Sequence, residues 1–279
     1  MRTPILTAVA CATWLAGASA QGPSPPPSGP GGTAPYAQPR TTDGQPDIGG
    51  FWHIVPFGTY SLEDMSLQPL GAGNFDTPAP GGSRIIDPPN GRIPYQPWAA
   101  ARAKDILDNH LDPRPHQLDP QSRCWLQGVP RAMANSETHF IQTPGQLVTL
   151  HEYSHSYRVI SLDDRPPVPE ELKLFMGDSR GRWDGHTLVI ETTNNNHIPW
   201  FDLVGSFHSD ALRVIERLTR VDDETIAYRV TFDDPRMYTR PWTVGYTMKR
   251  NTDPGWEQWE HACYEGDRSL ERLLSRPTK

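Results

Sequence analysis

Three things are scarce in this chain of 279 residues: cysteine, long apolar runs and an excess of positive charge. The formal net charge is −7, which argues against the concentrated basic surface that nucleic acids and anionic membranes require. The apolar run from Ile5 to Leu15 is too short to span a bilayer as a stable helix. We therefore expect a small-molecule ligand or substrate as the partner, with no nucleic acid, no membrane span and no cofactor.

The first 20 residues instead have the features of a secretory signal. Arg2 supplies the positive charge before the apolar run, and Ala18-Ser-Ala20 is a small-residue cleavage site. We expect cleavage after Ala20 and export to the periplasm or the cell exterior. Residues 21–46 are rich in proline and glycine and have little to bury, which predicts a disordered linker before one folded domain over residues 47–279.

Of the 3 cysteines, Cys124 and Cys263 remain after the signal is removed. An even number of cysteines in an oxidising compartment favours one disulfide between them. The alternative is two buried free thiols. Neither interpretation makes these cysteines catalytic.

From Thr138 onward the sequence reads almost entirely as strand. Asp184-Gly185 before the β-branched run of residues 187–193 predicts a tight type I′ hairpin. About eight or nine short antiparallel strands predict an all-β protein, an up-and-down, calycin-like barrel, with a two-sheet β-sandwich as the alternative. One helix is expected over residues 98–110, and the proline- and glycine-rich residues 56–131 predict an N-terminal wrap around the barrel or a lid over its mouth.

Alternation along the strands predicts which side chains face inward. Tyr228 and its apolar neighbours two residues away share one face, and Trp242 and Tyr246 share the corresponding face of the last strand. The same alternation places the carboxylates of Glu216 and Asp234 inside. A buried carboxylate needs a partner, so either an arginine counter-ion or a ligand is expected beside each.

Two further motifs match enzyme signatures. His151-Glu-Tyr-Ser-His155 is a literal H-E-x-x-H, but its β-branched surroundings predict a strand, in which the two histidines lie too far apart to share zinc. That strand would place His151, Tyr153 and His155 on one face, either as an exposed edge or as an acid–base pair lining a cavity. A zinc metallopeptidase is therefore the third choice of function, and we expect no metal.

The G-x-S-x-G around Ser179 precedes a hairpin rather than the helix that a nucleophile elbow needs. Arg180 and Arg182 are expected on the loop that leads into this hairpin, with Asp178 holding one of them. Their forked donors suit a carboxylate or sulfate. The alternative is that they only tie the loop to the barrel rim.

The ordered string of motifs resembles a large family of exported bacterial proteins that has no established reaction. It comprises Gly91-Arg-Ile-Pro94, Cys124, Gly177-Asp-Ser-Arg-Gly-Arg-Trp-Asp-Gly185, Thr187-Leu-Val-Ile-Glu-Thr192, Leu212-Arg-Val-Ile-Glu-Arg217, Asp234-Pro235, Arg240-Pro-Trp242 and Ala262-Cys-Tyr-Glu-Gly266. The resemblance covers roughly residues 47–273 and implies export and a β-rich domain, without any catalytic residue. Both cysteines fall inside its motifs, which fits a disulfide. Gly50-Phe-Trp52 is weakly similar to the Gly-x-Trp of lipocalins, whose tryptophan packs across the closed end of the barrel.

The function expected from these observations is an exported barrel that binds a small sugar- or phenol-like ligand in its interior. The alternative is a lyase, isomerase or hydrolase on the same scaffold that uses carboxylate or histidine acid–base chemistry. The acid–base candidates are Glu216, Asp234, His151 and Tyr153; the ligand-contact candidates are Arg180, Arg182, Trp52, Tyr228, Trp242 and Tyr246.

Overall fold

The structure is a computed structural model, and it describes residues 36–56, 60–67, 82–135, 137–261 and 263. The signal sequence and most of the expected linker lie outside these residues. None of the helices in the described ranges has the length and apolar character needed to cross a membrane.

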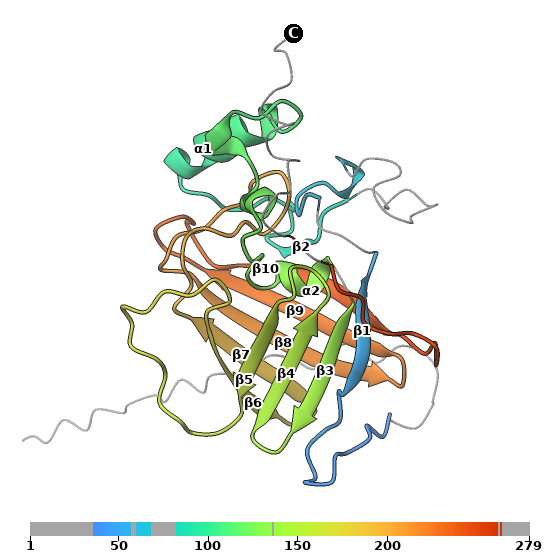
Figure 1. Cartoon of the computed structure of the whole chain (residues 1–279). Coiled ribbons are helices and arrows are strands. Elements are labelled where there is room, and N and C mark those ends of the chain that lie inside the picture. Colours follow the sequence, from blue (N-terminus) through green and yellow to red (C-terminus); the bar gives the residue numbers. More distant parts are fainter. Residues whose placement is uncertain (1–35, 57–59, 68–81, 136, 262, 264–279) are drawn as a thin grey trace, which may run out of the picture. The chain divides into compact units, whose positions relative to one another are not determined.

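Nine strands form a closed barrel, which confirms the predicted all-β barrel (Figure 1). In spatial order they are β1 (Gly50–Val55), β3 (Thr138–Thr143), β4 (Gln146–His151), β5 (Tyr157–Ser161), β6 (Asp178–Asp184), β7 (Thr187–Thr193), β8 (Arg213–Asp222), β9 (Thr225–Asp233) and β10 (Trp242–Arg250). Pairing of β1 with β10 closes the ring. A tenth strand, β2 (Ile85–Asp87), pairs with β10 outside the ring.

One seam departs from the predicted antiparallel meander. The pairing of β5 with β6 is parallel and joins only Ile160 to Ser179 and Ser161 to Arg180, whereas the other pairs around the ring are antiparallel. The reason is the long connection over residues 162–177, which carries the chain back along the barrel before β6 begins. A tight turn, which would enforce antiparallel pairing, is absent at this point.

The β6–β7 hairpin forms, but its turn lies one residue later than predicted. Asp184 pairs with Thr187, so the two turn residues are Gly185 and His186. Of these only Gly185 has a positive φ, +61°. A glycine at the first central position fits a type II′ turn rather than the expected type I′ turn.

Alternation predicted the barrel core correctly. Tyr228, Trp242, Tyr246 and their inward neighbours are at most 5% exposed. Trp52 lies at the end of the barrel that contains the β8–β9 turn, and its indole N–H donates to the Ile48 carbonyl at 2.9 Å. The Arg250 guanidinium lies 4.5 Å from the centre of the Trp52 ring, a cation–π contact. Gly50 has φ +115°, a backbone conformation that side-chain-bearing residues rarely adopt.

The segment that was predicted as a wrap or lid lies across the opposite end of the barrel (Figure 1). Its described helical elements are α1 (Pro97–Asp108) and the short 3-10 turns η1 (Met65–Leu67), η2 (Pro115–Gln117) and η3 (Pro120–Arg123), and α2 (Arg131–Ala134) follows at its end. The predicted helix forms with Pro97 in its first turn and ends two residues early, at Asp108. All four residues of α2 are buried. Phe201 packs on Phe232 and Trp242, so the loop around it also covers this end.

Candidate functional site

Glu216 faces the barrel interior, as alternation predicted, and is 0% exposed. The guanidinium of Arg158, on β5, grips both carboxylate oxygens: Nη1 donates to Oε1 at 3.1 Å and Nη2 donates to Oε2. The Tyr228 hydroxyl also donates to Oε1, at 2.6 Å. Burial and the Glu216 charge together raise the pKa of Tyr228, so it keeps its proton. The Glu216 carboxylate is therefore fully engaged by partners within the chain.

Asp234 is equally buried, at 0% exposure, but it holds a turn together. Oδ2 accepts the backbone N–H of Ser209 at 2.7 Å, and Oδ1 accepts the Ser209 hydroxyl at 2.9 Å and the backbone N–H of Arg236 at 3.1 Å. Both oxygens are therefore occupied. The two carboxylates that were expected to contact an interior ligand have internal partners instead.

The H-E-x-x-H segment is not a continuous strand, and this prediction was wrong. Strand β4 ends at His151, and the next five residues turn back into β5, with Ser154 and His155 at positive φ. The His151 N–H donates to the Ser156 carbonyl at 2.9 Å, which closes the turn. The row of His151, Tyr153 and His155 along one strand face therefore does not exist.

His151 lies inside the barrel, with Nδ1 3.2 Å from the Thr138 hydroxyl and Nε2 3.0 Å from the Thr149 hydroxyl. Burial and the nearby Arg158 charge lower the pKa of His151 to about 3, so the ring is neutral. His155 instead lies outside, with Nε2 3.1 Å from Glu260. Within the described residues there is no group of three or more histidine, cysteine or acidic side chains placed to hold a metal ion.

Ser179 of the G-x-S-x-G motif lies on β6 and is 2% exposed. Its hydroxyl accepts Nε of Arg158 at 2.7 Å and lies 3.1 Å from the Thr192 hydroxyl. Strand continues after Ser179, so the geometry is that of a buried structural serine rather than a nucleophile elbow.

Arg180 and Arg182 were predicted on a loop, but both lie within β6. Because the intervening Gly181 faces Ile160 and Leu188 of the core, the two arginines face outward. Arg180 makes a bidentate pair with Asp178 at 2.9 to 3.0 Å, and Arg182 is exposed. They share no site with Glu216.

The aromatic ligand-contact candidates fill the barrel instead of lining open space there. Trp52, Trp242 and Tyr228 are 0% exposed, and Tyr246 is 5% exposed. Tyr228 and Tyr246 stack at a centroid distance of 5.5 Å. The Tyr246 hydroxyl has no hydrogen-bond partner among the described residues, and burial raises its pKa.

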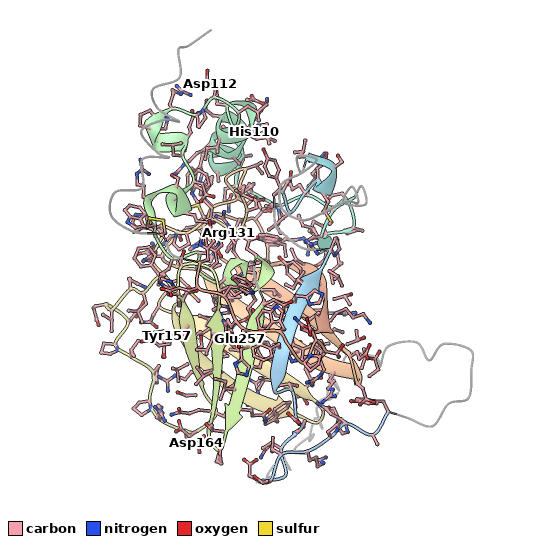
Figure 2. The ribbon with its side chains drawn as sticks, turned by 45° about the vertical axis from the view of Figure 1, so that its right-hand side comes forward. His110, Asp112, Arg131, Tyr157, Asp164 and Glu257 are labelled. Atoms are coloured by element: carbon pink, nitrogen blue, oxygen red, sulfur yellow. A yellow bond between two sulfur atoms is a disulfide. The ribbon has the colours of Figure 1, made fainter. Side chains whose placement is uncertain are left out.

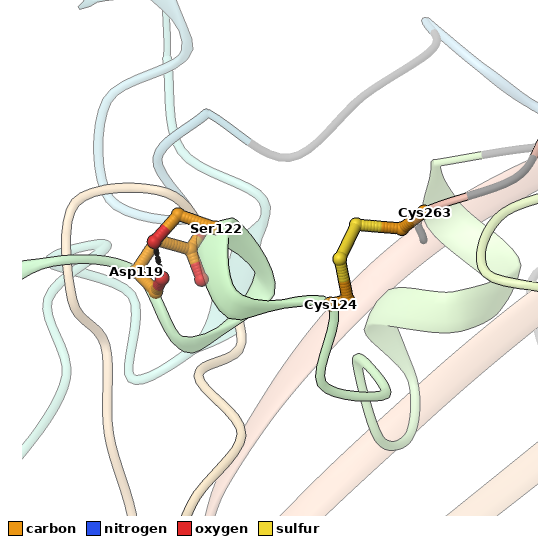
Figure 3. Close-up of a disulfide and its surroundings, with 4 residues drawn as sticks. All are labelled: Asp119, Ser122, Cys124 and Cys263. Carbon is orange, nitrogen blue, oxygen red and sulfur yellow. Dashed lines mark hydrogen bonds between the residues drawn. A yellow bond between two sulfur atoms is a disulfide. The ribbon is translucent and has the colours of Figure 1, made fainter. Parts of the chain in front are cut away.

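Tyr153, the remaining candidate, lies in a cleft of about 510 Å³ that the sequence did not predict. This cleft lies between the segment of α1 to η3 and the end of the described chain; Figure 2 shows His110 on the α1 side and Arg131 between it and the barrel. The disulfide Cys124–Cys263 is formed as predicted and borders the cleft, close to Ser122 of η3 and to Asp119, the residue that caps η3 (Figure 3). The polar and aromatic side chains lining it include Tyr60, His110, Asp119, Gln121, Tyr153 and His261.

Aromatic rings form two walls of the cleft. Tyr153 stacks on His261 with centroids 4.0 Å apart and an interplanar angle of 19°, and a backbone bridge pairs the same two residues. Tyr60 and His110, which also line the cleft, meet edge to face at 6.1 Å. Burial raises the pKa of Tyr60, so its hydroxyl stays protonated.

Among the described residues that line the cleft, the one carboxylate, that of Asp119, is paired with an arginine. The Asp119 carboxylate accepts Nη1 and Nη2 of Arg131 at 3.0 and 2.5 Å, and Arg131 is 1% exposed. Burial alone would lower the pKa of Arg131, but the Asp119 charge and hydrogen bonds outweigh burial and raise it. Arg131 also donates to the Gln121 side-chain oxygen at 2.8 Å. The buried Arg131 guanidinium thus neutralises the Asp119 carboxylate.

Sequence reasoning missed Tyr60, His110, Asp119, Gln121 and His261. No local pattern marks them, since they come from segments far apart in the chain. One signal was present: Asp119, Gln121 and Ser122 lie just before Cys124, and His261 lies just before Cys263. A disulfide predicted between these cysteines also predicts that the residues beside them meet.

Comparison with protein-family models, curated proteins and solved structures gives no match to this chain.

Proposed function

We propose that this is an exported β-barrel protein that binds a small, uncharged, sugar- or phenol-like molecule in the cleft around Tyr153. Export rests on the N-terminal signal pattern, and the disulfide is compatible with it. Membership of the exported bacterial family stays a prediction from the motifs.

The observation that carries the proposal is the chemistry of the cleft. Its acid, Asp119, is neutralised by the buried Arg131. Meanwhile the hydroxyls of Tyr60 and Tyr153 make no hydrogen bond to other described residues, and the rings beside them offer stacking surfaces. Aromatic faces with a few convergent polar groups are typical of small-ligand sites, and a volume of about 510 Å³ suits such a ligand.

The cleft replaces the barrel interior as the proposed site because the interior carboxylates are engaged. Glu216 is bound by Arg158 and Tyr228, and Asp234 by Ser209 and Arg236. A ligand there would have to displace these bonds, leaving a buried charge unpaired. A ligand in the cleft would not have to displace such bonds, because the hydroxyls of Tyr60 and Tyr153 make none to other described residues.

An acid–base enzyme, acting as a lyase, isomerase or hydrolase, is the second candidate. One observation favours it: Nδ1 of His110 lies 2.5 Å from the Leu107 carbonyl, which places a hydrogen on Nδ1 and makes Nε2 the basic nitrogen of the neutral ring. In an enzyme, loss of that base would abolish turnover and leave affinity largely intact.

Tyr153→Ala tests the binding proposal, with Tyr157→Ala as its matched control. Tyr157 lies four residues away on the outer wall and is 64% exposed. Titrations with glucose, galactose, phenol and resorcinol, followed by calorimetry, should show binding of at least one compound. Removing the Tyr153 ring should weaken it about tenfold, since a stacked aromatic contact contributes on the order of 1 kcal/mol.

Tyr157→Ala should bind like the wild type. Absence of binding by all four compounds, or equal weakening in both variants, would contradict the proposal. Thermal melts of both variants would confirm that the fold is intact.

A further inference from the structure

We infer that the cleft selects a phenol, and that the ring hydroxyl of the phenol donates its proton in a hydrogen bond to Nε2 of His110. The inference rests on the proposed function, because it names the ligand class and the recognising atom of the same cleft.

The first step is the tautomer of His110. Nδ1 lies 2.5 Å from the Leu107 carbonyl oxygen, one turn back in the chain. A carbonyl only accepts, so Nδ1 carries the hydrogen and Nε2 carries the lone pair of the neutral ring. Nε2 lies on the side of the imidazole away from the helix, and no other described residue bonds to it. His110 therefore offers the cleft a hydrogen-bond acceptor.

The second step is what an acceptor requires of a ligand. A hydroxyl can donate to Nε2, whereas an ether oxygen cannot, and a carboxylate would meet a second lone pair. Among the described residues that line the cleft there is no lysine or arginine, and Arg131 beneath it is paired with Asp119, so nothing described there favours an anion. The ligand should therefore carry a hydroxyl and no charge.

The third step separates a phenol from a sugar. Ile106, Leu111, Leu118 and Leu203 line the same cleft as His110. A sugar would place several hydroxyls against these apolar side chains, where each unpaired hydroxyl is penalised. A phenol has one hydroxyl and an apolar ring, which can pack between the Tyr153–His261 stack and the leucines.

The test compares phenol with anisole, which has the same ring but a methylated oxygen that cannot donate. Wild-type protein should bind phenol about tenfold more tightly than anisole in calorimetric titrations. This difference corresponds to the net contribution of about one hydrogen bond. His110→Phe keeps a ring but removes the acceptor, so phenol affinity should fall to that of anisole. His110→Gln, which restores an acceptor oxygen, should recover part of the preference. His116→Phe, at an exposed histidine of η2 outside the cleft, is the matched control and should change nothing.

The outcomes separate this inference from the proposed function. If glucose or galactose binds in a Tyr153-dependent manner while phenol does not, the proposed function stands and the phenol inference is overturned. Equal affinity for phenol and anisole in the wild type, or an unchanged preference in folded His110→Phe, also overturns it. If no probe binds in a Tyr153-dependent manner, both fail together.

Discussion

Arg158 is the residue on which the barrel interior depends most. Its guanidinium binds Glu216, Ser179 and Thr192, which lie on three different strands. A buried ion pair of this kind adds little net stability over apolar side chains of similar size, but breaking it leaves a charge without a partner. The pair therefore constrains how β5, β6, β7 and β8 meet across the parallel seam.

Glu216→Gln should for this reason lower the free energy of unfolding by roughly 3–5 kcal/mol, because Arg158 stays buried and unpaired. Urea denaturation beside the wild type measures the change. Glu216→Leu combined with Arg158→Met removes both charges and should restore most of the loss. A single variant as stable as wild type would show that the Arg158 charge has another counter-ion.

Alternation alone was enough to place Glu216 inside and to require a partner beside it, either an arginine or a ligand. It could not identify Arg158, because Arg158 lies on β5, on the other side of the parallel seam from Glu216. No local sequence pattern predicts which strands meet there. The same limit explains Asp234, whose partner Ser209 lies in an irregular loop. Local parity predicts the direction of a side chain, and topology alone predicts what it meets.

At the scale of elements, β6 is preceded by a glycine with no room for a side chain. Gly177 has φ +64°, and a Cβ there would lie 2.4 Å from the Thr192 methyl and 2.6 Å from the Thr193 carbonyl. Gly145, in the β3–β4 turn, has a similar φ of +76° but nothing within 4 Å of an added Cβ. An alanine at Gly145 therefore adds only backbone strain, whereas an alanine at Gly177 adds the same strain and steric overlap as well.

Gly145→Ala should cost about 1–2 kcal/mol, the strain of a left-handed residue. Gly177→Ala should cost that amount plus roughly 1–3 kcal/mol for overlap with β7. Chemical denaturation of both variants gives the comparison directly. Equal losses would mean that β7 moves aside freely and that the start of β6 is loosely packed.

The strands themselves were predictable because their apolar residues alternate, and glycine or proline marked the β3–β4 and β6–β7 turns. The β4–β5 turn was missed because its left-handed residues are Ser154 and His155, which carry no turn signature. The parallel seam was missed because nothing within a strand records the direction of its neighbour.

At the scale of the whole molecule, the disulfide joins residues separated by 139 positions. It ties η3 to the end of the described chain, and both ends line the cleft. The cleft could not be predicted from local pattern, since its walls come from at least four separate segments and meet only in the folded chain.

Replacing both Cys124 and Cys263 by alanine should lower the free energy of unfolding by roughly 4–5 kcal/mol in the chain-entropy model. The affinity for the ligand should also fall, because the His261 wall loses its tether. Urea denaturation and calorimetric titration measure the two effects, and reduced wild-type protein should behave in the same way. Unchanged unfolding would show that packing alone holds the wall.

The closing pair of the barrel joins β1 to β10, its first and last strands in chain order. A growing chain that has not yet reached Trp242 leaves β1 and β9 each with an unpaired edge. Such edges expose rows of N–H and C=O groups that can template pairing with another chain. Any molecule in which β10 is not docked therefore has two edges open to association with another chain, and docking of β10 gives both edges a partner in the same chain.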